Sequence, residues 1–256
     1  SRGSFDFLAE FGLGILDKAT VRTVGTIVRS GQATEQVGEF IRLSDLAPGD
    51  KEPAFLRSAF TGEHGAVRRT YQIPVSEFDK IPWSPLSYWT PPQIRELHET
   101  DAKLDPDVAG IEGRAIATAA KGMDTGDNDR FIQRLWESDG NPEFIPYAKG
   151  GSDAWIMPEV TRTLNWTDDG TELERFGGSN LKNSDKYGLE GLTWTYAKET
   201  GRRFGYFPSG GAFDGKGSML FPDDEDPWTL IAALNSSLYH SLFLSLTPER
   251  DWQVGD

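Results

Sequence analysis

The sequence contains no cysteine and only three histidines among its 256 residues. Without cysteine, disulfides and thiolate metal sites are excluded, and the composition fits the reducing cytoplasm. The histidines lie far apart in the sequence and lack the spacing of metal ligands. No apolar run reaches the roughly 18 residues needed to span a membrane. No basic start followed by an apolar segment marks a signal peptide. We therefore expect a cytoplasmic chain with no membrane partner and no metal.

Basic residues are also fewer than acidic residues. The chain has 26 Lys and Arg against 40 Asp and Glu, for a net charge of −14. A protein that holds nucleic acid by charge alone is expected to be basic, so a general nucleic-acid binder is excluded. Any contact with DNA must come from a local patch. The chain is otherwise typical of a folded protein, with 37% hydrophobic residues and enough length for one large or two small domains.

Residues 5–80 alternate between strand and helix patterns. The β-branched run Val21–Val28 predicts a strand, Glu39–Leu43 a shorter one, and Val67–Val75 a third. Pro53–Phe60 predicts a helix with its proline in the first turn. These elements are too few for a complete doubly wound domain and match the last strands of one.

A proline-rich stretch follows and predicts a domain boundary near residue 80. A helix then opens at Pro91 and runs to His98. Beyond residue 104, short apolar segments alternate with Gly, Asn and Asp clusters, which predicts short strands joined by long loops. Apolar residues at helical spacing predict one further helix that includes Trp228–Leu244. The fold class is therefore α+β, with domains at 1–80 and 81–256. Ser1 is not a methionine, and we expect a fragment of a larger protein.

Several catalytic motifs are disfavoured by their surroundings. Asp124-Thr125-Gly126 resembles an aspartic-protease triplet, but no second triplet exists to share a proton with it. The acids at 124, 127 and 129 do not have the spacing of a calcium loop. The Gly12-Leu13-Gly14 string is better explained by a turn between a strand and a helix than by nucleotide binding. No nucleophile elbow is present, so a self-sufficient hydrolase is the least favoured function.

Two segments carry residues suited to nucleic acid. Thr125–Phe131 combines a glycine turn with short polar side chains and an arginine, and Lys149 is followed by two glycines. Asn128 and Arg130 could contact base edges or phosphate, and Lys149 with the Gly150 amide could contact phosphate. An Asp–Arg pair and an Asx turn that pin the loop are an equally good account of 127–130.

Residues 194–216 form a local basic window in this acidic chain. Four positive charges alternate there with aromatic residues. Arginine can pair with phosphate or guanine, and aromatic rings can stack on bases. A strand pair with a packed aromatic face and a solvated basic face explains the same pattern.

An ordered series of motifs now points to a family. Residues 121–137 resemble the string "Gly-Leu-x-Thr-Gly-Asp-Asn-x-Arg-Phe…Trp-Glu" of BREX (Pgl-type) adenine-specific DNA methyltransferases. The segments that match further on, in the same order, are 147–151, 164–170, 190–195, 203–204, 213–217, 233–236 and 252–255. Leu8–Val28 is similar to the last strand pair of the family's catalytic domain, and Tyr88-Trp89 to the start of its specificity domain. Type IIG restriction–modification enzymes, with their TaqI-like target-recognition domain, share this architecture.

The resemblance implies transfer of a methyl group from S-adenosylmethionine to the exocyclic amine of adenine. The family's Asn-Pro-Pro-Tyr motif, which holds the flipped base, is absent, and Asn141-Pro142-Glu143-Phe144 departs from it. The cofactor-binding glycine motif is absent too. The implied chain therefore contains the end of a Rossmann-like methyltransferase sheet (1–80) and a target-recognition domain (81–256). We expect it to lack catalytic residues, to bind no cofactor and to be inactive alone.

The partner implied by this resemblance is double-stranded DNA, with other defence proteins as further partners. The predicted DNA-binding residues are Thr125, Asn128, Arg130, Lys149, Gly150, Trp194, Arg202, Arg203 and Lys216. The competing hypothesis is a protein-interaction module of a defence complex. In that case the acidic surface binds a partner and the aromatic segments only build the fold.

Overall fold

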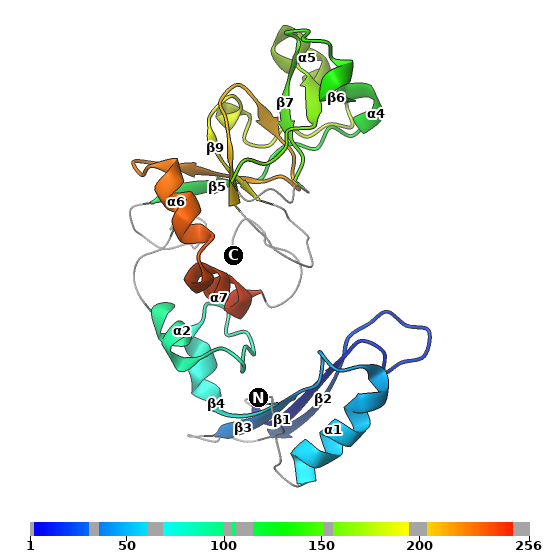
Figure 1. Ribbon diagram of the computed structural model, residues 1–256, viewed down its shortest axis with the longest axis vertical. Coiled ribbons are helices and arrows are strands. Elements are labelled where there is room, and N and C mark those ends of the chain that lie inside the picture. Colours follow the sequence, from blue (N-terminus) through cyan, green and yellow to red (C-terminus); the bar gives the residue numbers. More distant parts are fainter. Residues whose placement is uncertain are drawn as a thin grey trace. The chain divides into compact units, whose positions relative to one another are not determined.

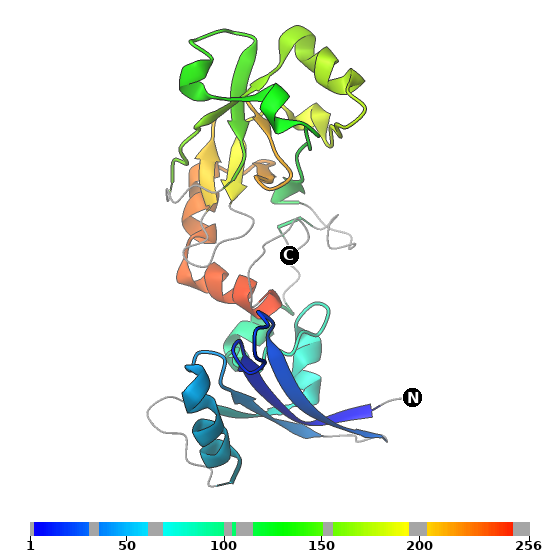
Figure 2. The same ribbon diagram turned by 90° about the vertical axis from the view of Figure 1, so that its right-hand side faces the viewer.

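The computed structural model describes residues 3–30, 36–60, 69–99, 104–105, 115–150, 156–194 and 204–247. The chain divides into two compact units, Ser1–Glu99 and Thr100–Asp256 (Figures 1 and 2). The described residues form three four-stranded sheets with short helices between them. The prediction of a mixed fold with short strands and few helices is confirmed at this level.

The first unit is built on the sheet β2-β1-β3-β4. Its strands are β1 (Gly3–Gly12), β2 (Thr23–Ser30), β3 (Val37–Arg42) and β4 (Thr70–Pro74). β1 runs parallel to β3, whereas β1–β2 and β3–β4 are antiparallel. The three predicted strands are present as β2, β3 and β4, each shifted by a few residues. The start of the third prediction, at 67–68, lies outside the described residues.

Helix α1 (Pro48–Phe60) is longer than the predicted helix and holds Pro53 in its interior rather than in its first turn. The amide that Pro53 lacks would have bonded to the carbonyl of Gly49, which lies in the exposed first turn and can be hydrated instead. Ala54 packs on Ala9, Ile41 and Leu43 on one face of the sheet. The buried Lys51 donates from Nζ to the carbonyls of Phe11 (2.5 Å) and Leu13 (2.6 Å). Lys51 therefore fastens α1 to the end of β1.

The Gly12-Leu13-Gly14 string forms a turn, but the turn leads toward strand β2 and not into a helix as predicted. Both glycines have positive φ, of 69° and 81°. A Cβ on Gly12 would lie 2.9 Å from Ser44, and one on Gly14 would lie 2.7 Å from the ring of Pro48. The glycines are needed because protein atoms approach them, which explains the motif without a nucleotide.

The other face of this sheet is covered by the 3-10 helix η1 (Val75–Lys80), the proline-rich stretch and α2 (Pro92–Leu97). Figure 1 shows α1 and α2 on opposite sides of the sheet. Tyr88 stacks on Phe40 with ring centroids 5.0 Å apart and donates to Glu10 Oε2 at 2.5 Å. Burial and the Glu10 carboxylate both raise the pKa of Tyr88. The proline-rich stretch packs on the sheet, and the first compact unit extends to Glu99.

The second unit contains two sheets. One has the antiparallel order β10-β9-β12-β5, with β5 (Ala117–Ala120), β9 (Gly191–Trp194), β10 (Phe204–Phe207) and β12 (Met219–Pro222). The other has the order β11-β7-β8-β6, with β6 (Ile132–Arg134), β7 (Phe144–Ala148), β8 (Arg162–Asn165) and β11 (Ala212–Phe213). β11 is parallel to β7, and the remaining pairs are antiparallel.

Short helices lie between the strands of the second sheet in the sequence. They are α4 (Asn128–Phe131), η2 (Leu135–Glu137), α5 (Thr167–Arg175) and η3 (Ser184–Lys186). Figure 1 shows α4, α5, β6 and β7 at one end of the unit and β5, β9 and α6 toward the other. The core under this sheet contains Met123, Phe131, Tyr147, Leu164, Leu173 and Ala212.

The helix predicted over 228–244 is two helices, α6 (Pro227–Leu234) and α7 (Ser237–Leu246), bent by 66°. The Ser236 side chain accepts from the Tyr239 amide and begins the second helix. Leu230, Ile231 and Leu234 pack under β9 and β10, as expected for core positions. Among the described residues no single helix has the length and apolarity to cross a membrane; only the bent α6–α7 pair, taken together, meets those two criteria.

The Glu77 carboxylate joins two elements of the first unit and gives the stability of that unit a pH dependence. It accepts from Lys80 Nζ at 2.9 Å and from Arg95 Nε at 3.2 Å, and Arg95 is 3% exposed. The hydrogen bond from Lys80, followed by that from Arg95, lowers the pKa of Glu77 below its ordinary 4.5. A lowered carboxyl pKa stabilises the fold above the unfolded value, and this contribution is lost as the pH falls through the folded value.

We predict that Glu77→Gln lowers the free energy of unfolding at pH 7 by about 1 kcal/mol. The gap between variant and wild type should close as the pH falls below 4.5, because protonation removes the same charge from Glu77. Amide hydrogen exchange of residues 70–97, measured at several pH values, tests this. A gap that stays constant with pH would contradict the assignment.

Candidate nucleic-acid interface

Three loops of the second unit meet at one junction. They are residues 121–126 before α4, 148–150 after β7 and 213–217 after β11. Backbone hydrogen bonds join them: Met123 N donates to Phe213 O at 2.9 Å, Gly215 N to Met123 O at 2.9 Å, and Asp214 N to Ala148 O at 2.8 Å. Residues far apart in the sequence are therefore held together by the main chain.

Glycines allow this close approach. Gly150 has a φ of 71°, and a Cβ there would lie 2.6 Å from the carbonyl oxygen of Lys216. A Cβ on Gly217 would lie 2.5 Å from the carbonyl of Ala148, and one on Gly122 would lie 2.0 Å from that of Phe213. Side chains at these positions would push the loops apart. The predicted role of the Gly150 amide in phosphate binding remains a prediction, but the structure gives this glycine a packing role.

The carboxylate of Asp214 lies at the centre of the junction and is 7% exposed. Its Oδ2 accepts from Tyr147 OH at 3.0 Å and from Lys149 Nζ at 2.8 Å, and its Oδ1 accepts from the Lys216 amide at 2.8 Å. Burial, followed by the Asp214 charge, raises the pKa of Tyr147, so its hydroxyl keeps the proton that it donates. Asp214 was not among the predicted site residues. The signal that could have identified it is its place directly before the string Gly215-Lys216-Gly217.

Asn128 joins the same network. Its Oδ1 accepts from Thr125 Oγ1 at 2.8 Å and from Lys149 Nζ at 3.1 Å. Thr125 is buried, whereas Asn128 is exposed at the start of α4. Bidentate reading of adenine by asparagine uses the amide oxygen as well as the nitrogen. Since the oxygen already has two donors, Asn128 offers its Nδ2 group, which suits a phosphate or the acceptor edge of guanine.

Arg130 is held by protein contacts. Its guanidinium pairs with Glu172 at 2.5 Å and lies 5.0 Å and 5.2 Å from the ring centroids of Phe131 and Phe176. The amide of Arg130 donates to the carboxylate of Asp127, which caps α4. These contacts match the loop-pinning alternative for residues 127–130. The side chain is nevertheless 47% exposed.

Lys216 is the most available of the predicted cations. Its side chain is exposed, and it makes no ion pair within the part of the chain that the structure describes. The junction thus brings together Thr125, Asn128, Lys149, Gly150 and Lys216 from three separate segments. Arg130 lies on the neighbouring α4.

The aromatic window is arranged differently. Trp194 is 6% exposed and lies opposite Phe204 in the β9–β10 pair, with ring centroids 5.7 Å apart. This is the packed strand pair that the sequence left open as the alternative to base stacking. Arg202 and Arg203 lie outside the described residues.

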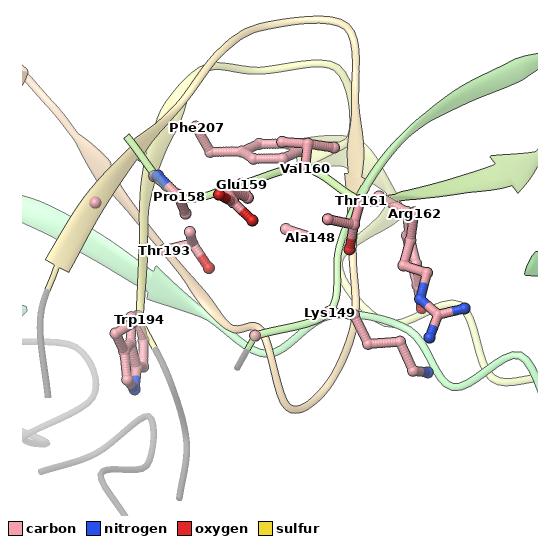
Figure 3. Close-up of a pocket in the computed structure, with 13 residues that line it drawn as sticks. Ala148, Lys149, Pro158, Glu159, Val160, Thr161, Arg162, Thr193, Trp194 and Phe207 are labelled. Atoms are coloured by element: carbon pink, nitrogen blue, oxygen red, sulfur yellow. The ribbon is translucent and has the colours of Figure 1, made fainter. Parts of the chain in front are cut away.

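A cavity of about 260 Å³ lies next to the junction. Figure 3 shows its lining, which includes Lys149, Glu159, Arg162, Thr193, Trp194 and Phe207. The lining also includes Gly150, so three of the predicted positions, Lys149, Gly150 and Trp194, line the cavity. Glu159 and Arg162 were not predicted from the sequence. No sequence motif singles out Arg162. Its neighbours across the sheet are known only from the strand register, which places it opposite Arg134.

The glycine turn at 12–14 leaves no open cradle for a nucleotide-like group. The Gly12 and Gly14 turn is filled by Ser44 and Pro48, and Lys51 occupies its carbonyls. Asn141, in the string that departs from Asn-Pro-Pro-Tyr, accepts from the Glu143 amide at 3.0 Å in an exposed turn. In the same described ranges, no group of three or more His, Asp or Glu side chains could hold a metal ion.

We predict that Gly150→Ala destabilises the second unit by about 3 kcal/mol and Gly140→Ala by about 1 kcal/mol. Both glycines have positive φ, of 71° and 70°, but a Cβ on Gly140 would meet nothing within 4 Å. The pair therefore separates backbone strain from the clash with Lys216. Urea unfolding measures both variants, and equal losses would contradict the loop-packing role of Gly150.

Comparison with known proteins yields two relatives. No family model matches the chain. It is similar to the adenine-specific methyltransferase BrxX of Escherichia coli O9:H4 (strain HS), with 28% identity over 256 residues, or 95% of the chain and 20% of the relative. It is also similar to the adenine-specific methyltransferase PglX of Lacticaseibacillus casei (strain Zhang), with 26% identity over 259 residues, or 92% of the chain and 20% of the relative. The chain spans about a fifth of the length of these relatives and is distantly homologous to adenine-specific methyltransferases.

Proposed function

We propose that the chain is part of a site-specific N6-adenine DNA methyltransferase and that its second unit recognises the DNA target. The observation that carries the proposal is the similarity of more than nine tenths of the chain to two adenine-specific methyltransferases. The proposed partner is double-stranded DNA, and the parent enzyme uses S-adenosylmethionine as methyl donor.

The first unit is proposed to be the end of the catalytic sheet. Supporting this, β1 and β3 are parallel and α1 packs on one face of the sheet, as in a Rossmann-like domain. The sequence contains no Asn-Pro-Pro-Tyr string. We propose that the base-holding motif and the cofactor site lie outside these residues and that the chain alone transfers no methyl group.

The second unit is proposed to contact DNA through the three-loop junction. Lys149, Lys216 and the Asn128 amide come together there, although the chain as a whole carries a net charge of −14. A local group of donors on loops held by buried contacts suits recognition, because base readout needs groups at fixed positions. Trp194 packs in the core of the other sheet, with Phe204 and Leu230.

The biological setting proposed for the parent enzyme is phage defence of the BREX type, with a type IIG restriction–modification system as the other setting. The motif series over residues 121–255 supports both, because the two classes share the specificity domain. Other defence proteins are proposed as further partners.

A protein-interaction module is the second candidate function, and one observation favours it. β2 lies at the edge of the first sheet, where Val24, Ile27 and Val28 are 59%, 59% and 57% exposed. Exposed apolar side chains on an edge strand are typical of a surface that another protein covers. This surface belongs to the first unit and is compatible with DNA recognition by the second.

The proposed function is tested by fluorescence anisotropy of labelled duplex DNA with the whole chain at about 50 mM and about 200 mM salt. Lys216→Gln should weaken binding and reduce the magnitude of the salt slope by about 1, because one phosphate contact is lost. The matched control is Arg57→Gln, which removes the same charge from an exposed position on α1.

Absence of duplex binding at low salt would overturn the DNA-recognition role and favour the protein-interaction module. Equal effects of Lys216→Gln and Arg57→Gln would remove the junction from the interface. Calorimetry that detects a micromolar site for S-adenosylmethionine would contradict the placement of cofactor binding outside this chain.

A further inference from the structure

We propose that Arg134 and Arg162, with Lys149 beside them, form a binding site for a phosphodiester of the DNA backbone. The site lies at the edge of the β11-β7-β8-β6 sheet, and neither arginine was among the predicted DNA-binding residues. The inference rests on the proposed function, since DNA supplies the phosphate.

The strand register places the two arginines face to face. β6 and β8 are antiparallel, and Arg134 is directly opposite Arg162. The next residues along, Leu135 and Thr161, are joined by a backbone hydrogen bond of 3.0 Å. Hydrogen-bonded and non-hydrogen-bonded pairs alternate in an antiparallel ladder, so Arg134 and Arg162 form a non-hydrogen-bonded pair. Side chains at such pairs lie on one face and are the closer of the two kinds, with Cβ atoms about 4.5–5.5 Å apart.

Two like charges in this arrangement repel each other. Within the described ranges, neither guanidinium pairs with a carboxylate. The nearby carboxylate of Glu137 is engaged by the backbone, accepting from the amide of Arg134 at 2.8 Å. Arg134 instead lies 5.1 Å from the ring centroid of Trp136, which is 65% exposed. An anion between the arginines would turn this repulsion into two charge-assisted hydrogen-bond pairs.

A third cation, Lys149, directly follows the neighbouring strand β7, and its ammonium is paired with Asp214. The β7–β8 ladder pairs Phe144 with Asn165, Ile145 with Leu164 and Pro146 with Thr163. Extended by one residue, this register places Tyr147 opposite Arg162. Lys149 comes two residues after Tyr147, so its side chain points to the same face of the sheet. Lys149 and Arg162 both line the cavity, and Figure 3 shows both on the side of the view away from Trp194. The carboxylate of Glu159 also lines the cavity.

The ligand suited to this site is a backbone phosphate rather than a base. Arginine side chains bind phosphate bidentately. Lys149 is already paired with Asp214, so the two arginines supply the charge for the phosphate, against the single carboxylate of Glu159 in the cavity lining. Arg134 and Trp136 are exposed, so an extended polymer can reach them. Phosphate contacts fix the register of a protein on the duplex without reading its sequence.

The test uses the whole chain and two duplexes of unrelated sequence, with binding followed by fluorescence anisotropy across a salt series. The variants are Arg134→Gln, Arg162→Gln and the double variant, with Arg57→Gln as the matched charge control. We expect the double variant to bind about tenfold more weakly on both duplexes, with the magnitude of the salt slope reduced by about 1, because one phosphate contact is lost. The single losses should not add, because both arginines hold one phosphate.

Thermal stability provides a second readout. If the arginines repel each other, Arg162→Gln should unfold at a temperature equal to or above that of the wild type, and duplex DNA should raise the wild-type unfolding temperature more than that of the double variant. Wild-type binding with a double variant that loses no more than Arg57→Gln would overturn this inference alone. Loss confined to one duplex would mean base reading and overturn the phosphate assignment. If the wild type binds neither duplex, the proposed function falls and this site falls with it.

Discussion

The second unit depends on one buried carboxylate. Asp214 accepts from Tyr147, Lys149 and the Lys216 amide, and so connects β7, the loop before β12 and, through Lys149 and Asn128, the start of α4. A buried charge is tolerated only when partners surround it, and here all three partners belong to segments that carry predicted recognition residues. The interaction that holds the fold together is therefore also the one that fixes the candidate interface. Lys149 serves both purposes, since its ammonium joins Asp214 and Asn128 while its side chain remains about one-third exposed.

The sequence predicted which helices and strands are present better than it predicted where they begin and end. β-branched runs marked β2 and β3 because side-chain periodicity is a local property. The helix over 228–244 divides at Asn235-Ser236 because the Ser236 cap competes with helix continuation, and apolar spacing alone does not register that competition. The proline-rich stretch after residue 80 reads as a linker, yet Tyr88 stacks on Phe40 and extends the first unit to Glu99. Such tertiary packing has no local signature.

The candidate site shows the same division between local and long-range information. The glycines at 126 and 150 marked loops correctly, but these glycines are needed because the loops pack on one another, as the contact between Gly150 and Lys216 demonstrates. Asp214 and Arg162 were missed because their importance lies in partners distant in sequence. Trp194 was predicted to stack on a base and is instead buried against Phe204, an arrangement that composition alone could not distinguish. In an acidic chain, recognition then depends on few cations at fixed positions rather than on net charge.

The central claim is that duplex DNA contacts the three-loop junction of the second unit. Amide hydrogen exchange with and without duplex DNA at low salt tests it directly, because it reports each segment of the whole chain separately. The account predicts slower exchange in the segments 121–128, 148–150 and 213–217, with the α1 helix unchanged. Bound DNA that leaves all three segments unaltered, or that protects only the first unit, would contradict it.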